Sequence, residues 1–105
     1  MVHKFHIPRV NVIESDAGFS VEILGMTGIR YRESDRSLLI HSELGGAEAP
    51  VMAIWRYHFS KWDPPYEQVP VTEAQKADIL KRICSALKWQ NIQVEIHSEG
   101  KGWGE

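Results

Sequence analysis

Apolar and polar residues alternate through much of the first half of the chain, which is the pattern of strands with one buried face. The alternation is clear over residues 19–24, 29–32 and 36–43, and a shorter stretch at 9–14 has the same character. A tight-turn signal at 34–35 separates two of these stretches. Strand, short turn and strand together predict a β-hairpin.

The second half of the chain has a different pattern. Residues 51–57 are apolar or aromatic on both faces, which is typical of a central strand. Pro64 and Pro65 follow, and because proline forces its predecessor toward extended geometry, no helix is expected there. Residues 92–96 alternate again and predict a last strand.

One helix is predicted between the prolines and that last strand. Thr72 is a candidate N-cap, and Gln75 stands where the second member of a capping box belongs. Apolar side chains then recur at helical spacing, at Ala77, Leu80, Ile83, Cys84 and Leu87. We therefore expect an amphipathic helix over about residues 72–89.

These elements predict an α+β fold. We expect a mainly antiparallel sheet of about five to six strands, with one amphipathic helix packed on one face, because a bare apolar sheet face is insoluble. Residues 1–97 are expected to form a single domain. The glycine-rich segment 98–105 is expected to be a flexible C-terminal tail.

The composition of the chain indicates which kinds of partner and which cell compartment to expect. The chain has 105 residues and a formal net charge of -2, which implies no strong field for nucleic acid or for an anionic membrane. Its single cysteine, Cys84, cannot form an internal disulfide, as fits a reducing compartment. No apolar run has the length of a signal peptide or a membrane span, so we expect a cytoplasmic protein.

The sequence carries no recognisable catalytic or metal-binding motif. His41 and Glu43 share a predicted strand face, but no third metal ligand is visible, so we expect no metal and no cofactor. Cys84 falls on the apolar stripe of the helix, where a thiol is an inert packing group. None of the serines lies in the Gly-x-Ser-x-Gly context that is typical of a catalytic serine nucleophile. The chain is therefore not expected to be an enzyme.

The predicted hairpin carries a cluster of basic residues. Arg30, Arg32 and Arg36 flank an aromatic residue, and such combinations can bind phosphates or single strands. Glu33 and Asp35 lie in the same stretch and cancel most of the positive charge. We therefore expect these charged residues to form ion pairs with one another within the hairpin, and we favour this interpretation over a nucleic-acid site.

Three tryptophans mark places where the chain is expected to pack. Trp55 lies on the predicted central strand, Trp62 in the proline turn and Trp89 at the helix end. Each is large enough to define part of the core, and Trp62 suits a protein interface equally well. Asp63, before the two prolines, is expected to accept backbone N–H bonds of the turn.

Four features in order resemble a family of small bacterial proteins. They are the run Gly28-Ile29-Arg30-Tyr31-Arg32-Glu33, then Ser42-Glu43-Leu44, then Trp62-Asp63-Pro64-Pro65, then the capped helix. The family is that of the predicted immunity proteins of polymorphic toxin systems, which neutralise a cognate toxin in the producing cell. The resemblance covers about residues 19–96 and implies a cytoplasmic, protein-binding, non-enzymatic role. A net charge of -2 is weak for a mimic of nucleic acid, which argues against a nuclease as the target.

Our first hypothesis is an inhibitor that binds a toxin domain and occludes it. The chain has no catalytic motif but has many Arg, Glu and Trp residues in and near its turns, and residues of these types often anchor protein interfaces. The residues expected to contact the partner are Arg30, Arg32, Glu33, Arg36, Glu43 and Trp62.

Two other interpretations stay open. The first is a small enzyme or ligand-binding domain whose sheet-face pocket holds His41, Glu43 and Arg56. The second is a self-associating structural domain, with a homodimer formed through an exposed strand edge or apolar sheet face.

Overall fold

The computed structural model describes residues 4–25, 28–45, 50–55 and 61–97. Seven strands and one helix make up these segments. In chain order they are β1 (Phe5–Arg9), β2 (Val12–Ser15), β3 (Phe19–Ile23), β4 (Gly28–Glu33), β5 (Arg36–Gly45), β6 (Val51–Trp55), α1 (Glu73–Trp89) and β7 (Gln93–His97).

The strands form one mixed sheet in the order β1-β2-β3-β4-β5-β6-β7. Each neighbouring pair up to β5–β6 is antiparallel, and β7 pairs with β6 in parallel because α1 carries the chain back across the sheet. The predicted α+β class, with a mainly antiparallel sheet and one helix against it, is confirmed. The sheet has seven strands, slightly more than the expected five to six.

The extra strand comes from the N-terminal region, where a single strand over 9–14 was expected. Arg9 instead ends β1 and Val12 begins β2, with a turn between them. Asn11 adopts a φ of 66° in that turn, a left-handed conformation that asparagine tolerates better than most residues. The expectation of one strand was wrong because this asparagine was not recognised as a turn residue.

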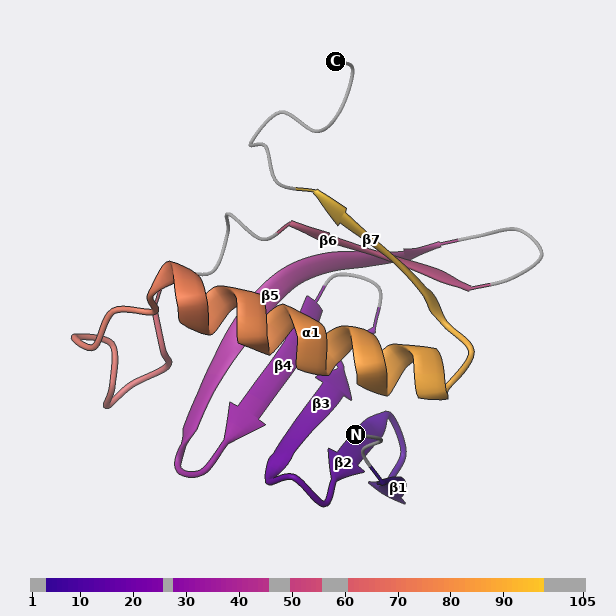
Figure 1. The fold of residues 1–105 in the computed structure, drawn as a ribbon, viewed down its shortest axis with the longest axis horizontal. Coiled ribbons are helices and arrows are strands. Elements are labelled where there is room, and N and C mark those ends of the chain that lie inside the picture. The colour runs from indigo at the N-terminus through magenta and orange to yellow at the C-terminus, as the bar shows by residue number, and fades with distance from the viewer. Residues whose placement is uncertain (1–3, 26–27, 46–49, 56–60, 98–105) are drawn as a thin grey trace.

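Strand β5 joins the two parts of the sheet. Its first six residues pair with β4, and its last four pair with β6. Figure 1 shows β5 as one long curved strand, with α1 lying across a single face of the bent sheet. We call the side covered by α1 the inner face and the opposite side the outer face.

The core fills the space between the inner face and α1. Leu38 and Ile40 of β5 are fully buried there, beside Tyr31 of β4 and Ile83 of α1. Alternate residues of each strand supply this layer because strand side chains point to opposite faces in turn. The buried positions of α1 are Ile79, Leu80, Ile83, Ala86 and Leu87.

Helix α1 begins close to where the sequence predicted. Thr72 is the N-cap, with Oγ1 accepting from the Gln75 N–H while the Gln75 side chain accepts from the Thr72 N–H. The buried stripe is rotated from the expected one, however, since Ala77 is exposed and Cys84 only half-buried. The spacing of apolar residues is compatible with two neighbouring buried stripes on the helix. In the structure, the stripe that contains Ile79 packs against the sheet.

The proline turn covers the part of β5 that lacks a second strand partner. The Asp63 N–H donates to the Ser37 carbonyl at 2.7 Å, and Lys61 forms an isolated bridge with Pro70. This contact satisfies a backbone acceptor on an otherwise open sheet edge. The turn therefore protects the hairpin edge as well as leading into α1.

Some expectations concern residues outside the described ranges. These are the side chain of Trp55, the residue Arg56 and the predicted tail 98–105. Within the described ranges, no helix combines the length and the apolar character that crossing a bilayer demands.

Candidate functional site

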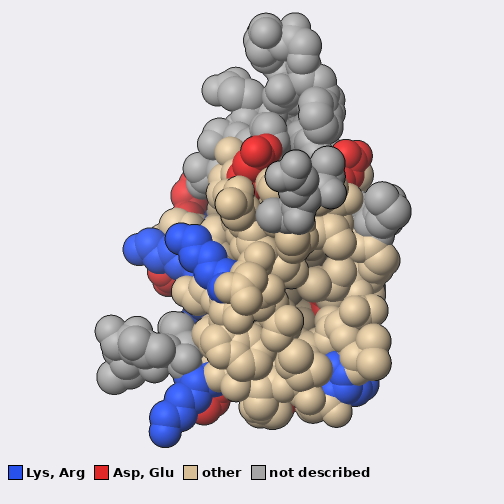
Figure 2. Space-filling view, turned by 90° about the vertical axis from the view of Figure 1, so that its right-hand side faces the viewer, with Lys and Arg blue, Asp and Glu red and all other residues tan. Residues whose placement is uncertain are grey.

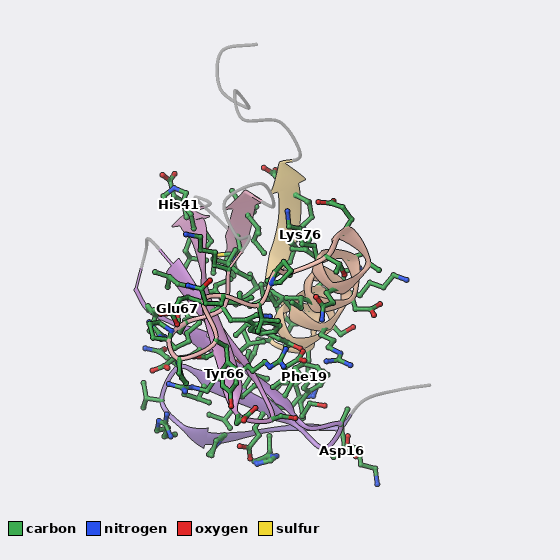
Figure 3. The ribbon with its side chains drawn as sticks, turned by 90° about the vertical axis from the view of Figure 1, so that its left-hand side faces the viewer. Asp16, Phe19, His41, Tyr66, Glu67 and Lys76 are labelled. Carbon is green, nitrogen blue, oxygen red and sulfur yellow. The ribbon has the colours of Figure 1, made fainter. Side chains whose placement is uncertain are left out.

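The β4–β5 hairpin presents different predicted site residues on its two faces. Arg30, Arg32, His41 and Glu43 lie on the outer face, because they alternate with the buried residues of the same strands. Glu33 and Arg36 lie on the inner side, near the tip of the hairpin. Figure 3 shows His41 on the side of the sheet away from α1.

Strand register sets the arrangement of the outer face. Arg30 stands opposite Glu22 of β3 on one side and opposite Leu39 of β5 on the other. Arg32 stands opposite Ser20 and Ser37 in the next row. Directly opposed side chains on one face lie close enough to interact, so Arg30 has an acidic neighbour in Glu22 and an apolar neighbour in Leu39.

Two exposed leucines form the apolar centre of the outer face. Leu24 is 39% exposed and Leu39 is 49% exposed. A Cβ added to Gly28 would lie 3.3 Å from Cδ1 of Leu39 and 4.0 Å from Cδ1 of Leu24, so both side chains close over this glycine. His41 stands opposite Gly28 in the register and therefore borders the leucine pair.

The sequence interpretation missed the two leucines as site residues. They occupy positions that the strand alternation assigns to the polar side, next to Ile23 in one case and between Leu38 and Ile40 in the other. A leucine out of phase with its strand is the signal that could have identified them, because an exposed apolar residue bordered by charge is typical of an interface.

The guanidinium of Arg30 is held in place from the proline turn. Nη1 of Arg30 donates to Oδ2 of Asp63 at 2.7 Å, and Oγ of Ser37 donates to the same oxygen at 2.8 Å. Asp63 was expected to accept backbone N–H bonds within its own turn, and that expectation was wrong for its carboxylate. The carboxylate instead ties the turn to both strands of the hairpin.

These contacts define a candidate binding surface on the outer face. Arg32, His41 and Glu43 are exposed, and Arg30 is half-buried against Asp63. Along β5, the surface extends from Leu39 to Glu43, which is about 13 Å of strand at roughly 3.3 Å per residue. We call this the outer surface and define it as Leu24, Arg30, Arg32, Leu39, His41 and Glu43.

On the inner side, Glu33 belongs to a hydrogen-bonded cluster with α1. The Tyr31 hydroxyl donates to Oε1 of Glu33 at 2.7 Å, and Nη1 of Arg82 donates to the Tyr31 oxygen at 2.8 Å and to Glu33 at 3.2 Å. Burial first, and then the bond to Glu33, raises the pKa of Tyr31 well above its ordinary value. The cluster anchors the hairpin to the helix.

Trp62 and Arg36 pack around the hairpin tip. Trp62 is only 2% exposed and belongs to the core, so its side chain is not a surface anchor in this structure. The Arg36 guanidinium lies 5.6 Å from the Trp62 ring centroid and 5.1 Å from that of Tyr66. Tyr66 in turn donates to Asp35, and this bond lowers the pKa of the Asp35 carboxyl. Contacts within the fold therefore occupy both of these predicted partner-binding residues.

Trp89, which was expected to be core, is 44% exposed, and its ring packs at 5.6 Å from that of Phe5. Its position near the helix end leaves one side of the indole outside the sheet–helix layer. The expectation that it defines the core was wrong.

The pocket expected at His41, Glu43 and Arg56 stays a prediction, because Arg56 lies outside the described residues. The hollow beside Glu43 is lined by Leu44, Val51, Ala53 and Glu95 among others, and His41 is not part of it. The described part of the chain holds no group of three or more His, Cys, Asp or Glu side chains suited to a metal ion. Burial raises the pKa of the Cys84 thiol, which disfavours the thiolate needed for nucleophilic attack.

Comparison with known proteins identifies the class. The model of one protein family, described as Immunity protein 74, matches residues 20–97. The match includes β3 from its second residue, all of β4 to β7 with α1, and all six residues of the outer surface. Searches of curated proteins and of solved structures gave no match.

The fold and this match define an immunity protein of a toxin system. The chain belongs to the Immunity protein 74 family, as the resemblance in its hairpin, proline turn and capped helix implied. Its general role is toxin inhibition, and families of this kind are generally non-catalytic.

Proposed function

We propose that this chain inhibits its toxin by binding it through the outer surface and occluding the part of the toxin that acts on the cell. Binding of this kind requires no catalytic group. The observation that carries the proposal is the exposed leucine pair over Gly28, which is bordered by Arg30, Arg32 and His41. An apolar centre with a charged and polar rim is the usual composition of a protein interface.

The opposite face of the sheet is less suited to this task. Helix α1 covers it, and the side chains of the inner face are buried in the core. A partner could reach those residues only by displacing the helix, at a large cost in buried apolar area. This contrast favours the outer face for toxin binding.

Arg30 is suited to an anchor because Asp63 already restricts its side chain. Ordering a long side chain on binding costs about 0.5–1.5 kcal/mol, and a restrained guanidinium has lost part of that freedom beforehand. Nη1 is the atom of Arg30 that donates to Asp63, which leaves the other N–H groups of the guanidinium to donate to a partner carboxylate. We therefore propose acidic groups on the toxin opposite Arg30 and Arg32.

The same proposal assigns the inhibitor to the cytoplasm, where the producing cell needs protection. Arg32 and Glu43 are the rim charges most accessible to a partner. Rim charges chiefly set the association rate and its salt dependence, so they are expected to steer the toxin more than to hold it.

Affinity capture from the native cell tests the proposal. Tagged protein is expected to retain one stoichiometric partner with toxin activity, and the Leu39→Asp variant is expected to lose it. Ala74→Asp is the control, since Ala74 is exposed on α1, on the opposite side of the sheet from the outer surface. Retention of the same partner by a folded Leu39→Asp variant would reject the proposed surface.

A further inference from the structure

A groove runs along strand β7, beside one flank of α1. Two adjoining hollows share Lys88 and together follow the strand from Gln93 to Ile96. On the helix side, Ala77, Cys84 and Ser85 are small, which leaves the groove open between longer neighbours. Ile96 contributes an apolar wall and is 39% exposed.

Strand β7 is also an open edge of the sheet. It pairs with β6 on one side, and no described strand pairs with it on the other. The Gln93 N–H donates toward β6, to the Pro50 carbonyl at 3.1 Å. Because successive strand residues direct their backbone groups to opposite sides, Val94 and Ile96 direct theirs away from β6.

The groove has a definite charge. Among the residues that the structure describes, Lys81 and Lys88 are the charged ones that line the groove, both are exposed, and no carboxylate lines either hollow. Figure 2, which faces the right-hand side of Figure 1, shows a broad uncharged surface with both basic and acidic side chains at its left margin. An apolar groove with cationic rims is complementary to a chain that alternates apolar and acidic residues.

We propose that β7 accepts an extended acidic segment of a protein partner as an added strand. The partner backbone would pair with Val94 and Ile96, its apolar side chains would fill the groove beside Ala77, and its carboxylates would meet Lys81 and Lys88. Strand addition of this kind derives affinity from main-chain hydrogen bonds and specificity from the pockets for alternate side chains. The site is separate from the outer surface, and the proposal does not rest on toxin binding there.

A second copy of this chain fits the groove less well than an acidic partner. In a symmetric dimer, each protomer presents the same patch to the other, so the positive rim formed by Lys81 and Lys88 would meet the same positive rim of the second copy. Like charges across an interface disfavour that pairing. The positive rim therefore selects a different chain.

The test uses a synthetic probe with the full-length protein. The probe is a capped peptide of about ten residues that alternates Val and Glu, and binding is followed by fluorescence anisotropy and by NMR amide shifts. We expect saturable binding that shifts the amides of Val94 and Ile96. A peptide alternating Val and Lys is expected to show no binding at the same concentrations.

Variants separate the charge, the edge and the groove. Lys81→Glu combined with Lys88→Glu is expected to weaken binding at least tenfold, while the control Lys61→Glu, outside the groove, leaves it unchanged. Ile96→Pro removes an N–H that points away from β6 and is expected to abolish binding, since proline is tolerated on edge strands. Ala77→Trp, made on the exposed side of α1, fills the groove without altering β7 and is expected to abolish it too.

Three results would overturn the proposal. The first is equal binding of the acidic and basic peptides. The second is binding that persists in both Ile96→Pro and Ala77→Trp. The third is concentration-dependent self-association that Ile96→Pro removes, which would make a second copy the occupant.

Discussion

At the scale of single residues, Asp63 links the proline turn to the hairpin. Its carboxylate accepts hydrogen bonds from Arg30 and Ser37, and its N–H donates to the Ser37 carbonyl. Both members of the Arg30–Asp63 ion pair have 30% exposed side chains, so solvent screens part of their attraction. The same pair orients Arg30 on the outer surface.

We predict that Asp63→Ala lowers the free energy of unfolding by about 1–2 kcal/mol, because two side-chain donors lose a charged acceptor. Asp63→Asn keeps an acceptor for Ser37 and should lose less. Urea unfolding monitored by circular dichroism measures both changes. An alanine variant as stable as the wild type would show that the two bonds contribute nothing in solution.

The ionisation of Tyr31 is coupled to the fold. Burial and the bond to Glu33 raise its pKa above the ordinary value of about 10. Because the folded-state pKa is the higher one, this contribution to stability is complete below about pH 10 and is lost as pH rises above it.

We predict that ultraviolet titration of the folded protein leaves Tyr31 un-ionised until alkaline unfolding begins. In Tyr31→Phe, the decline in stability above about pH 10 should be shallower. Ionisation of all three tyrosines near pH 10 in the folded wild type would contradict this interpretation.

At the scale of elements, successive side chains of strand β5 point alternately to the inner face and to the outer face of the sheet. Leu38 is fully buried under α1, whereas its neighbour Leu39 is 49% exposed on the outer face. The two leucines share chemistry, strand and sequence context, so they form a matched pair for testing which face carries stability.

We predict that Leu38→Ala lowers the free energy of unfolding by about 2–5 kcal/mol, as buried Leu-to-Ala changes do. Leu39→Ala should change it by no more than about 0.5 kcal/mol. Denaturant unfolding of both variants measures the contrast. Comparable losses at the two positions would mean that the outer face is buried in solution.

At the scale of the whole molecule, local signals were enough to predict much of the fold. The capping box at Thr72 gave the start of α1, and the turn at Ser34, with a φ of 51°, joins the predicted hairpin strands. These features depend on residues close together in the chain. The turn at Asn11 was missed although it is equally local, because asparagine was not weighed as a left-handed residue.

The candidate site depended more on contacts between distant parts of the chain. Strand alternation placed Arg30, Arg32 and His41 on a common face, but it could not show that Asp63 restrains Arg30 from 33 residues away. The burial of Trp62 likewise depends on how the proline turn folds back over the inner side of the hairpin. Long-range packing of this kind leaves no periodic trace in the sequence.

The outer surface is tested most directly by the affinity of the captured toxin for the Leu39→Asp variant, measured by isothermal titration calorimetry. Loss of a central interface contact costs about 2 kcal/mol or more, so we predict a dissociation constant at least about 30-fold weaker than that of the wild type. Ala74→Asp, on the helix side of the sheet, should bind like the wild type. The contrary result is a folded Leu39→Asp variant whose dissociation constant lies within about threefold of the wild-type value, a loss of binding free energy of less than about 0.7 kcal/mol. That result would contradict the proposal that the toxin binds the outer surface.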